Sequence, residues 1–154
     1  MVETEPVDIL LVEDNPSDAE LALPALKKCK VANRILHVRD GAEALDFLFR
    51  RGEHAARSGE KRPTLVLLDL KLPKVDGLQV LQQIKNDPST RAIPVILLTS
   101  SKEESDMASG YQLGVNSYIQ KPVNFGEFQE VVRQLGMYWL LVNSKPPAAA
   151  FQNT

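Results

Sequence analysis

Polar side chains follow short apolar runs at four places along this 154-residue sequence. Glu13 and Asp14 follow the first run, Asp69 follows the third, and Thr99 and Lys121 come at the ends of the two later ones. Each has an ordinary explanation when taken alone, because an acid often caps a turn and a lysine usually lies on the surface. If the runs are parallel strands, however, their carboxyl ends meet at one edge of a sheet. The combination therefore predicts a single crevice that gathers all of these groups.

The chemistry of such a crevice follows from its charges. Three carboxylates a few ångströms apart repel one another by roughly 4 kcal/mol per pair at an effective dielectric constant near 20. A hard divalent cation relieves this repulsion, and Mg²⁺ (or Mn²⁺) suits one or two carboxylates completed by phosphate oxygens. We therefore predict that Asp69 is a nucleophile that forms an acyl phosphate. Lys121, the Thr99 hydroxyl and the cation would then bind the oxygens of the phosphoryl group.

The elements that must position these residues are visible as an alternation of two patterns. Segments with helical spacing of apolar residues, such as Leu78, Leu81 and Ile84, lie between short apolar runs. Asn124 is predicted to cap the last helix. Strand alternating with helix five times indicates an α/β domain with right-handed crossovers. The predicted strands are residues 9–12, 35–38, 65–68, 95–98 and 117–119.

Composition excludes several classes of function. The net charge of −2 and the mixture of Lys and Arg with acids provide no basic stripe, so nucleic-acid binding is not expected. The single cysteine, Cys29, allows no internal disulfide and fits a reducing compartment. No apolar run approaches the roughly 20 residues needed to span a bilayer, and the first seven residues lack the basic charge of a secretory signal. A cytoplasmic protein with no membrane partner is expected.

The length suits one domain. We predict a single domain over residues 1–143 and a flexible tail over 144–154, which begins Ser-Lys-Pro-Pro and cannot form a core of its own. The polar segment 51–62 is predicted to be a long loop. Pro24 lies inside a predicted helix, where it should cause a kink. Neither the loop nor Pro24 suggests a function.

Four motifs of this sequence resemble the signatures of bacterial receiver domains, the phosphoryl-accepting modules of two-component systems. They are residues 11–15 (LVEDN), 67–77 (LLDLKLPKVDG), 97–101 (LLTSS) and 118–122 (YIQKP). The resemblance covers about residues 7–143 and implies a flavodoxin-like fold, a five-stranded parallel sheet of order 2-1-3-4-5 flanked by five helices. It also implies a protein without a separate turnover activity, which catalyses only its own phosphorylation and slow dephosphorylation.

The resemblance assigns roles to individual residues. Asp69 becomes the phosphoacceptor, Lys121 pairs with the phosphate, and the Lys121–Pro122 peptide bond is expected to be cis. The metal ligands implied are the carboxylates of Glu13, Asp14 and Asp69 and the main-chain carbonyl oxygen of Lys71. Lys71 and Ser101 occupy the two positions at which the lifetime of the phosphorylated state is modulated.

The same residues suggest a switch. Phosphorylation adds about −1.5 to −2 charge at Asp69. We expect Thr99 to move toward the phosphoryl group and Tyr118 to turn inward into the vacated space, which would repack the face formed by the fourth helix, the fifth strand and the fifth helix. With no output domain in the sequence, signalling would then proceed by protein contacts.

A narrower resemblance concerns partners. Phe47-Leu48, the long loop before the third strand, and residues 98–106, 115–118 and 138–142 are similar to small stand-alone regulators that pair with bacterial phytochromes. The phosphoryl donor implied is a light-regulated sensor histidine kinase. A phosphotransfer protein is an alternative recipient of the phosphoryl group. The apolar run from Tyr138 to Leu141 is either core packing or a homodimer interface of the C-terminal helix.

The motifs disfavour two other classes of protein. A flavodoxin-like redox protein would carry a phosphate-binding loop where Glu13 and Asp14 stand, and these acids would repel the flavin phosphate. A phosphatase with an aspartyl-phosphate intermediate would show Asp-x-Asp, whereas Asp69 is followed by Leu70 and Lys71. A non-switching scaffold receiver and a phosphorelay intermediate remain open alternatives.

Overall fold

The structure is a computed structural model that describes residues 7–28, 34–57 and 62–151. It contains one parallel sheet of order β2-β1-β3-β4-β5, as expected. The strands are β1 (Ile9–Val12), β2 (Ile35–Val38), β3 (Leu65–Leu68), β4 (Val95–Thr99) and β5 (Ser117–Gln120). The α-helices are α1 (Pro16–Lys27), α2 (Gly41–Leu48), α3 (Gly77–Asn86), α4 (Glu104–Gln112) and α5 (Phe125–Met137).

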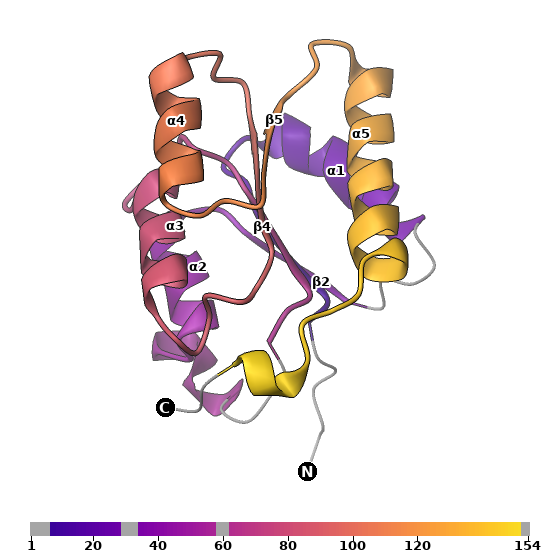
Figure 1. Ribbon diagram of the computed structural model, residues 1–154. Helices are drawn as coiled ribbons and strands as arrows, with labels where there is room; N and C mark the ends of the chain where they lie inside the picture. The colour runs from indigo at the N-terminus through magenta and orange to yellow at the C-terminus, as the bar shows by residue number, and fades with distance from the viewer. Residues whose placement is uncertain (1–6, 29–33, 58–61, 152–154) are drawn as a thin grey trace.

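The helices cover both faces of the sheet. Helices α1 and α5 lie side by side on one face, and α2, α3 and α4 cover the other (Figure 1). Successive residues of a strand point to opposite faces, so Leu10 and Val12 pack toward α2 and α3 whereas Ile9 and Leu11 pack toward α1 and α5. The continuous apolar runs of β1, β3 and β4 are therefore buried on both sides.

Side-chain caps fix the starts of four α-helices just beyond the strand ends. Asn15 and Asp40 cap α1 and α2, and Asp76 caps α3 with a capping box that includes Gln79. The predicted cap at Asn124 is confirmed, since its side-chain oxygen accepts the Glu127 N–H at 3.1 Å. Each cap satisfies an amide that has no partner within its helix, which stabilises the helix start at the edge where the predicted site lies.

Two segments differ from the expectations for loop and tail. Residues Gly52–Arg57 form a 3₁₀-helix, η1, within the segment predicted to be a loop; residues 58–61 lie outside the described residues. After α5, the chain continues through a π-helical turn, η2 (Tyr138–Val142), and a 3₁₀ turn, η3 (Ala148–Ala150).

The chain that follows α5 connects the two faces of the sheet, and its later part, residues 144–151, belongs to the segment expected to be a flexible tail. Trp139 and Leu140 pack against the core beneath α1 and α5, whereas Phe151 packs against the core beneath α2 and α3. The chain therefore crosses the amino-terminal edge of the sheet, away from the strand ends that carry the predicted site (Figure 1). Partial burial of Phe151 gives this segment an attachment that its composition alone does not predict.

Helix α1 contains Pro24 as the sequence indicated. The helix continues through this residue from Pro16 to Lys27, and the Pro24 carbonyl oxygen accepts the Lys28 N–H at 3.1 Å. No feature of the structure gives Pro24 a functional role.

Candidate functional site

The ammonium of Lys121 lies at the centre of a cluster of carboxylates. Its Nζ is 2.6 Å from Glu13 Oε1, 2.8 Å from Asp69 Oδ2 and 2.8 Å from Asp18 Oδ2. Glu13 follows β1, Asp69 follows β3, Lys121 follows β5, and Asp18 lies in the first turn of α1. Three of the predicted site residues thus meet at one point, together with an acid that the sequence reasoning did not identify.

The sheet itself brings these residues together, because its hydrogen-bond ladder extends one residue beyond each strand. The Asp69 N–H donates to the Val12 carbonyl oxygen at 3.1 Å, and the Lys121 N–H donates to the Thr99 carbonyl oxygen at 2.7 Å. The backbone of each residue is therefore fixed relative to its neighbouring strand, and the side chains need only extend over the edge of the sheet.

Glu13 is the least favourably placed charge of the cluster. Its side chain is buried, and this burial raises its pKa strongly; the hydrogen bond from Lys121 opposes the rise, and the negative charge of Asp69 adds to it. The net effect raises the pKa of Glu13 from 4.5 to about 7. One ammonium therefore does not compensate the carboxylates around it.

Lys121 responds in the opposite direction. Burial alone would lower its pKa, but its hydrogen bonds to Asp18, Asp69 and Glu13 outweigh that effect and raise the pKa above its usual 10.5. The lysine is therefore positively charged throughout the physiological range and supplies a fixed cation beside Asp69.

The backbone on the other side of Asp69 is tightly packed. The Lys71 N–H donates to Asp69 Oδ1 at 3.3 Å, and the Gly77 N–H donates to the Leu70 carbonyl oxygen at 2.8 Å. A Cβ atom on Gly77 would lie 2.2 Å from the Asp69 carbonyl oxygen. Only glycine therefore permits the start of α3 to approach the strand end this closely.

Residues 9–133 match the response regulator receiver domain family, which is most of the chain. This chain belongs to that family. Among curated relatives, it is 45% identical to the probable methanogenesis regulatory protein FilR2 of Methanothrix harundinacea, over 94% of this chain and 91% of that protein. It is also 39% identical to the response regulator Rcp1 of Synechocystis sp. PCC 6803, over 93% of this chain and 95% of that protein.

Solved structures give the same result. The Mn²⁺-bound form of Rcp1 superposes with a TM-score of 0.85 at 39% identity, covering 92% of this chain and all of that one. The phosphorylated cyanobacterial phytochrome response regulator RcpA superposes with a TM-score of 0.86 at 40% identity, covering 93% of this chain and all of that one. This receiver domain is therefore related to phytochrome response regulators over nearly its whole length.

The residues of the expected switch are connected in this receiver domain through Ser101. The Thr99 hydroxyl accepts the Ser101 N–H at 3.3 Å, and the Tyr118 hydroxyl donates to the Ser101 carbonyl oxygen at 3.3 Å. Ser101 itself is buried, and its hydroxyl donates to Asp106 of α4 at 2.6 Å. The resemblance to receiver domains implies that Ser101 modulates the lifetime of the phosphorylated state. In the structure, the hydrogen bond that its hydroxyl donates to Asp106 attaches the β4–α4 loop to α4.

Two other predicted ligands of the receiver domain occupy the rim of the site. Asp14 is exposed beside the buried Glu13, because neighbouring residues of an extended chain point in opposite directions. Lys71, whose main-chain carbonyl oxygen is the predicted ligand, is also an exposed residue. The Lys121 ammonium lies between the carboxylates of Glu13 and Asp69. Within the described ranges, no group of three acids, histidines or cysteines is arranged to hold a metal ion.

The donor set nevertheless fits a hard divalent cation. Its side chains supply carboxylate oxygens. The single positive charge of Lys121 faces the three carboxylates of Glu13, Asp18 and Asp69, so up to two negative charges are left uncompensated. A divalent cation balances that excess, and oxygen ligands are those that Mg²⁺ and Mn²⁺ prefer.

The expectation of a cis peptide bond between Lys121 and Pro122 is wrong. None of the peptide bonds in the described parts of the chain is cis. The trans form of a bond to proline is the more stable by about 0.5–1 kcal/mol, and with it the Lys121 side chain already reaches the carboxylates.

Sequence reasoning also missed the role of His37. Its Nε2 lies 2.9 Å from the Glu13 carbonyl oxygen, and because that oxygen can only accept, Nε2 must carry the hydrogen. Its position in β2, directly beside β1, is the signal that could have indicated a contact with the chain that follows β1.

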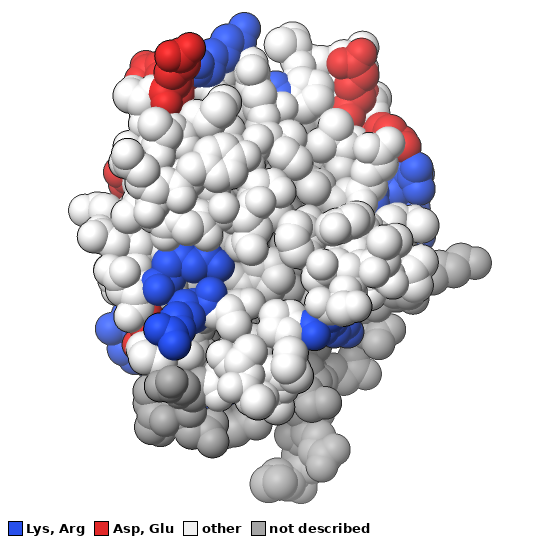
Figure 2. Space-filling model, in the orientation of Figure 1, with Lys and Arg blue, Asp and Glu red and all other residues white. Residues whose placement is uncertain are grey.

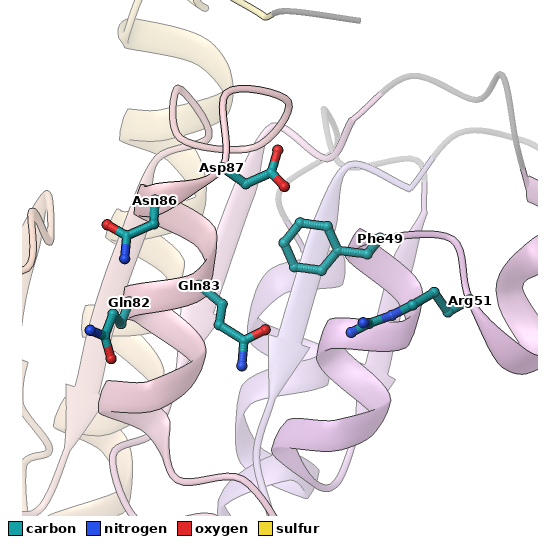
Figure 3. A pocket seen from close by; sticks show the side chains of 6 residues that line it. All are labelled: Phe49, Arg51, Gln82, Gln83, Asn86 and Asp87. Atoms are coloured by element: carbon teal, nitrogen blue, oxygen red, sulfur yellow. The ribbon is translucent and has the colours of Figure 1, made fainter. Parts of the chain in front are cut away.

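A hollow on the receiver domain lies elsewhere. An open groove of about 330 Å³ runs between the carboxyl-terminal parts of α2 and α3 (Figure 3). It is lined by Phe49, Arg51, Gln82, Gln83, Asn86 and Asp87. None of the predicted site residues lines it.

In the described part of the chain, no helix is both long enough and apolar enough to cross a membrane.

Proposed function

We propose that this protein is a single-domain response regulator that accepts a phosphoryl group on Asp69 from a sensor histidine kinase. The observation that carries the proposal is the position of the Lys121 ammonium, 2.8 Å from Asp69 Oδ2 at the carboxyl edge of the sheet. A buried cation beside a free carboxylate stabilises the charge that develops on a transferred phosphoryl group. We assign residues 1–143 to one receiver domain that acts in the cytoplasm.

The transfer itself requires little covalent chemistry from the protein. An Asp69 carboxylate oxygen attacks the phosphorus of the kinase phosphohistidine; the new P–O bond forms as the P–N bond breaks, and the imidazole leaves with the electron pair and takes up a proton. Lys121 and the Thr99 hydroxyl would bind phosphoryl oxygens. A Mg²⁺ ion held by Glu13, Asp14, Asp69 and the Lys71 carbonyl oxygen would neutralise further charge, and Mn²⁺ could replace it.

The contacts around Ser101 support a switch that follows phosphorylation. Thr99 would exchange its hydrogen bond with the Ser101 N–H for one with the phosphoryl group, and Tyr118 would lose its contact with the Ser101 carbonyl oxygen as it turns inward. Because the Ser101 hydroxyl bonds to Asp106, movement of this loop would reach α4. Lys71 and Ser101 remain our candidates for residues that set the lifetime of the phosphoryl group.

The acceptor is tested by incubating the purified protein with acetyl phosphate and Mg²⁺ and measuring intact mass. We expect the wild-type protein to gain one phosphoryl group and Asp69→Asn to gain none. Asp76→Asn is the matched control, since Asp76 is an exposed acid that follows β3 but caps α3. Phosphorylation of the Asp69→Asn protein, or an unchanged mass of the wild-type protein, would show that the acceptor is wrongly assigned.

The class of kinase is proposed from the relatives. Similarity to RcpA and Rcp1 supports a phytochrome-type histidine kinase as the donor. Transfer of radiolabelled phosphate from such a kinase within its first turnover, compared with transfer from kinases of other sensor classes, tests this. Equal transfer from every kinase would remove the phytochrome assignment without affecting the acceptor. Onward transfer of label to a phosphotransfer protein would instead indicate a phosphorelay intermediate, and binding independent of phosphorylation would indicate a scaffold.

Output would proceed through the surface formed by α4, β5 and α5. Figure 2 shows that the middle of this face, between α4 and α5, lacks charged side chains. Met107 and Tyr111 of α4 and Tyr138 and Leu141 of η2 are exposed. These residues support a homodimer that uses the end of the C-terminal helix. Light scattering with and without a phosphoryl mimic tests it, and a monomer under both conditions would refute the dimer.

A further inference from the structure

Asp18 is the member of the carboxylate cluster that comes from a helix. It lies in the first turn of α1, where the Asn15 side chain accepts its N–H at 3.2 Å. Its Oδ2 lies 2.8 Å from the Nζ of Lys121, the residue that follows β5. The capping interaction therefore places this carboxylate where it contacts the lysine directly.

The contact matters because the donors of Lys121 are limited. An ammonium has three N–H donors, and Glu13, Asp18 and Asp69 lie at hydrogen-bonding distance from it. All three donors are thus occupied before any phosphoryl group arrives. A phosphoryl oxygen can bind Lys121 only if one of these carboxylates releases its hydrogen bond.

Exposure indicates which carboxylate releases its bond. The Glu13 and Asp69 side chains are 5% and 11% exposed, whereas that of Asp18 is 26% exposed. A buried carboxylate that loses its partner pays the cost of desolvation, whereas a partly exposed one is rehydrated by water. Asp69 also carries the incoming group, so its contact with Lys121 is modified rather than lost.

We infer that Asp18 is a positioning residue that binds the third N–H of Lys121 in the unphosphorylated protein and releases it when the phosphoryl group binds. The inference rests on the proposed function. It assigns Asp18 an opposing effect: because its hydrogen bond to Lys121 must be broken, the carboxylate disfavours the phosphorylated state and limits the affinity for a phosphoryl group.

Asp18→Asn tests this role, because the amide oxygen can still accept from Lys121 but carries no charge. The probe is beryllofluoride, a phosphoryl mimic, titrated into the whole protein at saturating Mg²⁺ by calorimetry. We expect Asp18→Asn to bind the mimic about fivefold more tightly than wild type, since a hydrogen bond from the ammonium to a carboxylate exceeds one to an uncharged amide by about 1 kcal/mol. Glu20→Gln is the matched control: it removes the same charge from an exposed position of α1 and should change nothing.

Affinity for Mg²⁺ alone, followed by NMR, separates this role from a general effect on the site. Loss of a carboxylate should weaken Mg²⁺ binding while mimic binding at saturating Mg²⁺ strengthens. The inference would be overturned if Asp18→Asn bound both Mg²⁺ and the mimic more weakly than wild type, or if it bound the mimic equally well at saturating Mg²⁺. The same gain in mimic affinity in Glu20→Gln would also overturn it. A wild-type protein that binds no mimic would instead refute the proposed function.

Discussion

Replacement of Glu13 by Gln should change the pH dependence of stability in the metal-free protein. The Glu13 side chain is 5% exposed, and burial, opposed by Lys121 and reinforced by the charge of Asp69, raises its pKa from 4.5 to about 7. Gln has nearly the same shape but does not titrate. The difference between the two proteins therefore isolates the cost of the Glu13 charge.

The size of the effect follows from linkage. A pKa raised from 4.5 to about 7 means that the folded state binds this proton more tightly than the unfolded state does. The associated loss of stability is absent below pH 4.5, grows as the pH rises, and is complete above pH 7, where it reaches about 3 kcal/mol at 1.36 kcal/mol per pKa unit. Between about pH 5.5 and about pH 8, wild type should lose about 2 kcal/mol relative to Glu13→Gln.

Urea unfolding of both proteins at several pH values, in the presence of a chelator, measures this difference. Glu20→Gln, at an exposed position of α1, should run parallel to wild type. Added Mg²⁺ should reduce the difference between wild type and Glu13→Gln at high pH, because a bound cation stabilises the charged carboxylate. Parallel curves for wild type and Glu13→Gln in the absence of metal would refute the reasoning.

Two further predictions concern stability elsewhere in the domain. Lys85→Met keeps the aliphatic stem but removes an ammonium that donates to Asn116 and to two main-chain carbonyl oxygens before β4. We expect the free energy of unfolding, measured with urea, to fall by about 1–3 kcal/mol. An unchanged urea midpoint would contradict this prediction. Gly77→Ala would place a Cβ 2.2 Å from the Asp69 carbonyl oxygen. We expect the free energy of unfolding to fall by about 1–3 kcal/mol and phosphorylation by acetyl phosphate to be slower in the intact-mass assay. A variant as stable as wild type would show that the start of α3 can shift freely.

The sequence by itself determined the fold class and most of the candidate site. The continuous apolar runs of β1, β3 and β4 indicate strands buried on both faces, and alternation with helical segments indicates parallel pairing. Parallel strands end at one edge, so the positions of Glu13, Asp69 and Lys121 at strand ends were sufficient to predict that they converge. The motifs then indicated the strand order, which local patterns do not specify.

Only the tertiary structure decided which groups contact Lys121. Asp18 reaches the lysine because α1 packs beside the sheet at a particular rotation, and residues 103 positions apart in the chain are related by packing rather than by any local period. Asp14 faces outward for a similar reason, since the end of β1 turns its neighbour Glu13 inward. The attachment of Phe151 to the opposite face of the sheet likewise depends on an apolar surface assembled from several distant segments. Spacing within one segment predicts the type of each element, whereas contacts between segments depend on how the assembled core fixes their relative rotation and distance.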